Sequence, residues 1–180
     1  YRKYQPVDQT DREKFEHYLE TIPQTIRHGF KVLSELCGNK HIVCEDVVNH
    51  SDPKLALPIV GRTDIHFTDF QTAERSSVAV SPPGDPVLSV CELKTSWSRP
   101  GRIKKDGSRS FSSAKLPSQP NINHLQQLAF YCCALEKRSS ISPYLIYLTA
   151  DDFIIHTEKN CTDLEPANLK NYYEQLIQKC

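Results

Sequence analysis

Two stretches decide the fold of this chain: GRTDIHF, residues 61–67, and VLSVCELKTSW, residues 87–97. The second is rich in β-branched and apolar residues and predicts a strand over 87–95. Side chains alternate between the two faces of a strand, so Glu92 and Lys94 share one face while their apolar neighbours point to the other. A carboxylate and an ammonium group are therefore expected to project together.

The earlier stretch has the same alternation. In a strand, Arg62, Asp64 and His66 share a face, and Gly61 permits another part of the backbone or a side chain to approach closely. If the two strands are neighbours in one sheet, the side chains of Asp64 and Glu92 converge.

Two converging carboxylates beside a lysine suit a hard divalent cation. Mg²⁺ is usually held by one or two carboxylates together with substrate phosphates, and Mn²⁺ accepts the same oxygen ligands. Such an ion can polarise a phosphoryl oxygen and activate water, and a lysine can orient that water or balance charge. The alternative is that Asp64, Glu92 and Lys94 lie on exposed faces of edge strands, with Glu92 and Lys94 simply paired.

Working outward toward the N-terminus, a helix is expected over 11–37, broken at Pro23. Its apolar stripe runs through Ile26, Phe30, Leu33 and Cys37, and Gly38 ends it. Strands are expected over 41–49 and 56–67, with a turn at NHSDPK between them, and a further strand over 76–80 is expected to form a hairpin with 87–95 around SPPGDP.

Toward the C-terminus, residues 96–120 show no apolar periodicity and are expected to be a functional loop. A helix is expected over 121–137, capped by Asn121 or Asn123, then a hairpin over residues 150–152 and a closing helix over 164–178. The fold class expected is α/β, a mixed central sheet flanked by helices, in a single domain over residues 1–180.

Composition limits the remaining possibilities. The 180 residues carry 22 basic and 22 acidic side chains, which argues against a histone-like polyanion binder. No apolar window is long enough for a membrane span and no signal peptide is evident, so an intracellular chain without membrane contact is expected, in the mitochondrial matrix, nucleus or cytoplasm. The seven cysteines form no Cys-x-x-Cys pair, so neither zinc nor an iron–sulfur cluster is expected. The absence of methionine suggests a piece of a longer chain.

The segment after the second strand is strongly basic and includes two aromatic residues. Phosphates attract Lys and Arg, and unpaired bases stack on flat side chains, so this segment is a candidate nucleic-acid interface. Its candidate residues are Trp97, Arg99, Arg102, Lys104, Lys105, Arg109, Phe111 and Lys115. His124, near the start of the following helix, could contact a phosphate there. The alternative is a solvated loop whose charge serves solubility.

GRTDIHF, then ELKTSW, then a helix carrying Gln127 and Tyr131 resemble, in this order, the motifs of the PD-(D/E)XK nuclease superfamily. The resemblance is to its RecB-like branch, and within it to the mitochondrial genome maintenance exonucleases. It covers residues 61–131 and implies a restriction-endonuclease-like core. The first helix departs from the family pattern, because the usual Gly-x-x-x-His followed by Glu is not intact.

The resemblance implies that Asp64, Glu92 and the backbone carbonyl of Leu93 bind Mg²⁺ or Mn²⁺ and that Lys94 is the catalytic lysine. Gln127 and Tyr131 would position substrate or metal-site side chains, and His28 or Glu35 could complete the site. The implied function is a metal-dependent deoxyribonuclease, preferentially a single-stranded DNA exonuclease in replication, repair or recombination. The alternatives are an endonuclease of the superfamily acting on duplex, junction or RNA, and a catalytically silent nucleic-acid-binding module. Protein partners, digestion polarity and oligomeric state are left open.

Overall fold

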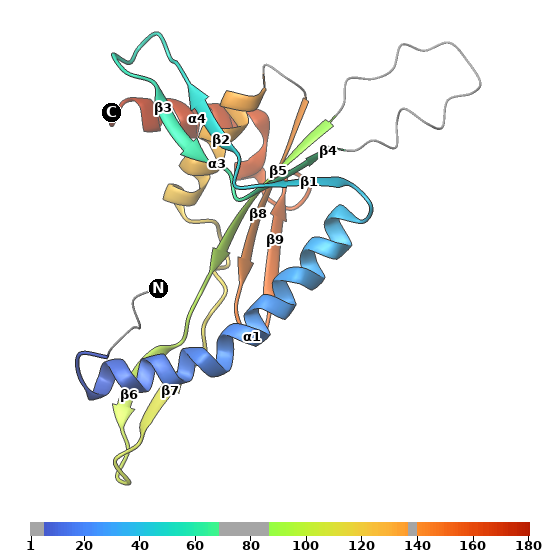
Figure 1. Ribbon diagram of the computed structural model, residues 1–180. Helices are drawn as coiled ribbons and strands as arrows, with labels where there is room; N and C mark the ends of the chain where they lie inside the picture. The colour runs from blue at the N-terminus through green and yellow to red at the C-terminus, as the bar shows by residue number, and fades with distance from the viewer. Residues whose placement is uncertain (1–5, 69–86, 137–139) are drawn as a thin grey trace. The chain divides into compact units, whose positions relative to one another are not determined.

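The computed structural model describes residues 6–68, 87–136 and 140–180 (Figure 1). The chain forms two compact units, each assembled from three segments. The smaller unit consists of Tyr1–Glu35, Thr95–Leu116 and Tyr147–Ile154. The larger unit consists of Leu36–Lys94, Pro117–Ile146 and Ile155–Cys180. In the part of the chain that is described, no helix is both long and apolar enough to cross a lipid bilayer.

A five-stranded sheet forms the centre of the larger unit, in the order β1-β4-β5-β8-β9. Its strands are β1 His41–Cys44, β4 Ile65–Thr68, β5 Val87–Thr95, β8 Ser140–Leu148 and β9 Phe153–Thr157. β4 is antiparallel to both β1 and β5. The amide of Ser96, just after β5, donates to the carbonyl of Leu148 at the end of β8, so these neighbours end together and run parallel, as drawn in Figure 1. The prediction of an α/β fold with a mixed sheet flanked by helices is confirmed.

The predicted strands over 41–49 and 56–67 are each divided in two. β2, Val47–His50, and β3, Ile59–Arg62, form a separate two-stranded sheet. The break arises because Glu45 has a left-handed φ of 53°, which interrupts the strand. Two backbone hydrogen bonds bridge the break. Glu45 N–H donates to the Asp64 carbonyl at 3.0 Å, and Thr63 N–H donates to the Asp46 carbonyl at 2.9 Å.

The expected turn between these strands is confirmed, since Asp52 accepts the amide of Lys54 at 2.8 Å. The predicted 76–80 strand and its SPPGDP turn lie outside the described residues.

Two helices complete the larger unit. α3, Ile122–Leu135, packs on α4, Pro166–Ile177, which follows the short 3-10 helix η1, Thr162–Leu164. The predicted Asn121 cap is confirmed, because its side chain accepts the amide of Asn123. Leu128 of α3 and Leu145 and Ile146 of β8 are completely buried. The apolar spacing predicted for α3 therefore lies in the core.

The long N-terminal helix of the smaller unit is unbroken, contrary to the predicted interruption at Pro23. α1 spans Gln9–Cys37 with Pro23 inside it. A proline removes one backbone donor from the helix, and the many remaining i to i−4 bonds on either side hold the helix continuous. The Thr21 hydroxyl, expected to cap a second segment, instead donates to the carbonyl of His17 at 3.1 Å. Gly38, with φ 52°, ends the helix as predicted.

The predicted stripe of α1 is confirmed at Cys37, which is buried, but not at its first two positions. Ile26 and Phe30 are 52% and 68% exposed, whereas Thr25 and Val32 are buried. Gly29 shares the buried face, where an added Cβ would lie 3.4 Å from the Leu148 side chain. The face that α1 buries here therefore carries Thr25, Gly29 and Val32 rather than the large apolar residues Ile26 and Phe30.

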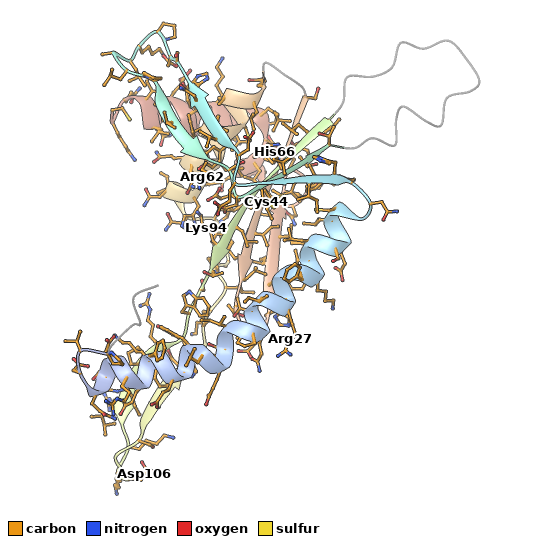
Figure 2. The ribbon with its side chains drawn as sticks, viewed as in Figure 1. Arg27, Cys44, Arg62, His66, Lys94 and Asp106 are labelled. Carbon is orange, nitrogen blue, oxygen red and sulfur yellow. The ribbon has the colours of Figure 1, made fainter. Side chains whose placement is uncertain are left out.

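The predicted loop over 96–120 contains a β-hairpin. β6, Arg99–Ile103, pairs with β7, Arg109–Ser112, and Asp106 lies at its tip (Figure 2). Gly107 has φ 82°, which favours glycine in the turn. Short strands without apolar alternation give no periodic signal, and this explains the wrong prediction.

Candidate active site

Asp64 and Glu92 lie side by side, as the sequence predicted. Ile65 is paired with Cys91, and continuing this antiparallel register by one residue sets Asp64 opposite Glu92. Asp64 itself is in the break between β3 and β4 rather than within a strand. Its Oδ2 accepts the amide of Leu93 at 2.8 Å, which fixes the carboxylate against β5.

Arg62, Asp64 and His66, expected on one face, have different polar partners. Arg62 pairs with Glu45 at 3.0 Å in an exposed position. The Nε2 atom of His66 lies 4.0 Å from the Asp46 carboxylate. The break at Asp64 interrupts the alternation on which the prediction rested.

Glu92 is an unusual buried acid, with a side chain that is 0% exposed. Its Oε1 atom pairs with the Lys94 ammonium, while Oε2 is enclosed without a hydrogen-bond partner in the described parts of the chain. Burial raises the pKa of Glu92 to about 7, the Lys94 hydrogen bond opposes that rise, and the nearby Asp64 carboxylate adds to it. The ion pair with Lys94 therefore does not fully offset the desolvation free energy of the buried Glu92 carboxylate.

Lys94 links this acid to α3. Its Nζ atom, at the end of β5 (Figure 2), donates to Gln127 Oε1 at 2.9 Å as well as to Glu92. The Gln127 amide in turn donates to the Tyr131 hydroxyl at 3.1 Å. Burial raises the pKa of Tyr131, and the Gln127 hydrogen bond opposes this effect. Glu92, Lys94, Gln127 and Tyr131 therefore form a hydrogen-bonded polar network, and Asp64 lies beside it, bonded to the Leu93 amide.

The close approach predicted at Gly61 occurs within this network. A Cβ at position 61 would lie 2.6 Å from the Phe130 ring and 2.7 Å from the Tyr131 ring. Only a residue without a side chain allows the β3 backbone to lie against α3 here. Gly61 thus helps to hold Tyr131 in position.

The polar network has the chemistry of a divalent cation site. Neighbouring carboxylates repel when both are ionised, and an unpartnered, buried carboxylate oxygen is suited to a cation. In the described ranges there is no group of three or more His, Cys, Asp or Glu side chains that could hold a metal ion. Asp64 and Glu92 supply two, which fits ions such as Mg²⁺ that take their other ligands from water and phosphate.

The remaining candidates differ in their surroundings. His28 and Glu35 both belong to the smaller unit, where Glu35 is exposed and His28 is half-buried. His124 lies in the first turn of α3 in the larger unit. Burial lowers the pKa of His124, and the positive charge of Lys94 lowers it further, so the imidazole is near the polar network.

The basic segment 97–115 belongs to the smaller unit. Five of its cations are exposed to solvent: Arg99, Arg102, Lys104, Lys105 and Lys115. Arg109 is instead engaged within the unit, donating to Glu13 at 2.8 Å and to Thr10 at 3.0 Å. Phe111 stacks on His17, and Trp97 contacts Tyr18. Sequence reasoning missed His17 and Tyr18, since nothing in their spacing on α1 distinguishes them.

Comparisons with known proteins add little. No protein-family model matches the chain, and no curated protein matches it. A crystal structure of SSO0001 is similar with a TM-score of 0.43 and 18% identity, covering 92% of this chain. The chain spans 61% of the length of that protein.

Proposed function

We propose that this chain is a Mg²⁺- or Mn²⁺-dependent nuclease with a restriction-endonuclease-like core, of the RecB-like branch of the PD-(D/E)XK superfamily. The observation that carries the proposal is the buried Oε2 atom of Glu92, which lacks a partner in the described chain and lies beside Asp64. A purely structural acid at this depth would have both carboxylate oxygens partnered or would be replaced by a neutral residue. Glu92 pairs with Lys94 through Oε1 alone, and a cation-binding role beside a second carboxylate explains why Oε2 has no partner in the described chain.

The residues of the network have separate roles in phosphodiester hydrolysis. Asp64 and Glu92, with the Leu93 carbonyl, would hold the ion, which supplies Lewis-acid polarisation and lowers the pKa of bound water. Lys94 is held between Glu92 and Gln127, so its charge is fixed where it can orient water or balance the phosphate charge. Gln127 and Tyr131 fix the position of Lys94 and present polar groups to the substrate.

Single-stranded DNA is the proposed substrate and cutting from an end the proposed mode. The exposed cations of the smaller unit, Arg99, Arg102, Lys104, Lys105 and Lys115, supply phosphate contacts that do not depend on sequence. His124, near Lys94, is a further phosphate contact. Binding should therefore weaken steeply with salt.

The test is digestion of linear and circular single-stranded DNA with Mg²⁺, Mn²⁺ or a chelator. The unaltered chain is compared with Lys94→Ala and with Lys159→Ala, a matched control at an exposed turn. Metal-dependent loss of linear DNA only, abolished by Lys94→Ala and retained by Lys159→Ala, supports the exonuclease. Cutting of the circle would instead identify an endonuclease. Binding that never leads to cutting with either metal would refute the nuclease and indicate a nucleic-acid-binding module.

A further inference from the structure

Two aromatic pairs lie close together in the smaller unit. The His17 and Phe111 rings stack with centroids 4.1 Å apart and an interplanar angle of 9°. The Tyr18 and Trp97 rings are tilted, with centroids 5.5 Å apart. Because His17 and Tyr18 are adjacent on α1, the two pairs join that helix to the segment that follows β5.

Three of these four rings, all but that of Tyr18, border a cavity of about 180 Å³. His17, Trp97 and Phe111 line it together with the turn at Ala150 and Asp151. Trp97 is 36% exposed, so part of its ring is open to a ligand. The Nε2 atom of His17 is enclosed and has no hydrogen-bond partner within the described residues. An enclosed polar atom of this kind gains from any ligand that pairs with it.

The lining indicates which chemical class the cavity would accept. It is smaller than the sites of drug-sized ligands, and its lining includes three flat rings, those of His17, Trp97 and Phe111. Asp151 is the only acidic or basic side chain other than His17 among the described lining residues, so the cavity is unsuited to a phosphate. A neutral heteroaromatic ring with an amino group fits better, because the ring can stack and a carboxylate accepts from amino groups such as cytosine N4.

The surrounding charge indicates that such a ring belongs to a nucleic acid strand. The same segment carries the exposed cations Arg99, Arg102 and Lys115, outside the cavity lining. Phosphates of a strand would contact these cations while one base leaves the stack and enters the cavity.

We propose that the smaller unit binds one unstacked nucleobase of single-stranded nucleic acid in this cavity and prefers bases with an exocyclic amino group. His17, Trp97 and Phe111 supply the stacking surfaces, and Asp151 accepts from the amino group. The proposal rests on the proposed function only for the choice of a single-stranded nucleic acid as ligand.

The test uses the fluorescence of Trp97, the single tryptophan of the chain, in the presence of a chelator so that no strand is cut. Twelve-nucleotide strands of dC, of dT and of abasic sites are titrated into the full chain. We expect the dC strand to bind about tenfold more tightly than the dT strand, because cytosine offers an exocyclic amino group to Asp151 and thymine does not; this ratio corresponds to about 1.4 kcal/mol. The abasic strand should bind through its phosphates and leave the fluorescence of Trp97 nearly unchanged.

Two variants assign the contacts. Asp151→Ala should reduce dC binding to the level of dT and leave dT binding unchanged. Glu16→Ala removes one acid from an exposed position on α1 that does not line the cavity, and it should preserve the preference. Phe111→Ala should weaken both strands by about tenfold or more, as expected when a stacking surface is lost. If that variant does not fold, the ratio of dC to dT affinity in the unaltered chain decides.

Equal affinity for dC and dT, a preference that survives Asp151→Ala, or equal fluorescence changes with abasic DNA would overturn the proposal. The outcome is separate from that of the nuclease. Base preference without cleavage would refute the nuclease and keep the cavity assignment. Cleavage without base preference would support the nuclease and refute the cavity assignment.

Discussion

Replacing Glu92 by glutamine should stabilise the chain in the absence of metal while abolishing cleavage. The side chain is 0% exposed and its Oε2 atom has no hydrogen-bond partner in the described chain. A neutral amide of the same shape removes the cost of burying the charge. Stability and activity should therefore change in opposite directions at this one residue.

The size and the pH dependence follow from the pKa of Glu92. Folding raises it from an ordinary value of 4.5 to about 7. Below the ordinary value the acid is protonated in both states and costs nothing. As the pH rises from 4.5 to about 7, Glu92 loses its proton in the unfolded chain but keeps it in the folded chain, so the free energy of unfolding falls. Above pH ~7 the folded chain is destabilised by the full amount, about 3 kcal/mol. The glutamine variant lacks this cost at every pH.

Urea unfolding in a chelator at about pH 5 and pH 8, followed by circular dichroism, measures the difference. The gain from Glu92→Gln should be about 2 to 3 kcal/mol larger at the higher pH. Glu45→Gln is the matched control, because Glu45 is 70% exposed and its surface pair with Arg62 contributes little. If Glu92→Gln gave the same change at both pH values, or destabilised the chain more at pH 8, the assignment of Glu92 as a desolvated acid would be refuted.

Three further predictions concern packing and reactivity. Gly61→Ala should destabilise the chain by about 1–3 kcal/mol in urea unfolding, because its Cβ would lie 2.6 Å from an aromatic ring of α3; an unchanged midpoint would contradict the close approach. Arg109→Ala should raise the amide hydrogen-exchange rates of the β6–β7 hairpin by about tenfold, since it removes the hydrogen bonds from the hairpin to Glu13 and Thr10 of α1. Unchanged rates would show that these bonds do not hold the hairpin. Cys91, whose pKa is raised by burial, should resist a thiol reagent in the folded chain, while the exposed Cys44 reacts at once; equal rates would exclude the burial described.

Local sequence patterns were sufficient where the signal depends on near neighbours. The β-branched and apolar content of VLSVCELKT predicted β5, and the alternation of side chains along a strand predicted Glu92 and Lys94 on one face, which their contact confirms. Asn121 was expected as one of two possible caps because a side-chain oxygen there can reach the first free amides of the helix. Periodicity and capping are short-range, so the sequence alone carries them.

The predictions from sequence were wrong where burial or strand pairing depends on segments that are distant along the chain. The stripe predicted for α1 included Ile26 and Phe30 because they are hydrophobic, whereas the helix buries Thr25, Gly29 and Val32. The β6–β7 hairpin depends on cross-strand pairing and on the bonds of Arg109 to α1 rather than on apolar alternation. Neither effect leaves a periodic trace in the sequence.

The candidate site divides in the same way. The sequence by itself singled out the candidate residues Asp64, Glu92, Lys94, Gln127 and Tyr131, because residue type and spacing are local properties. Only the tertiary structure decided that Glu92 is buried with one oxygen unpartnered in the described chain, and that Lys94 is shared with Gln127 from α3. Burial and the polar partners of a side chain depend on which distant segments pack around it, and that information arises only when the chain has folded.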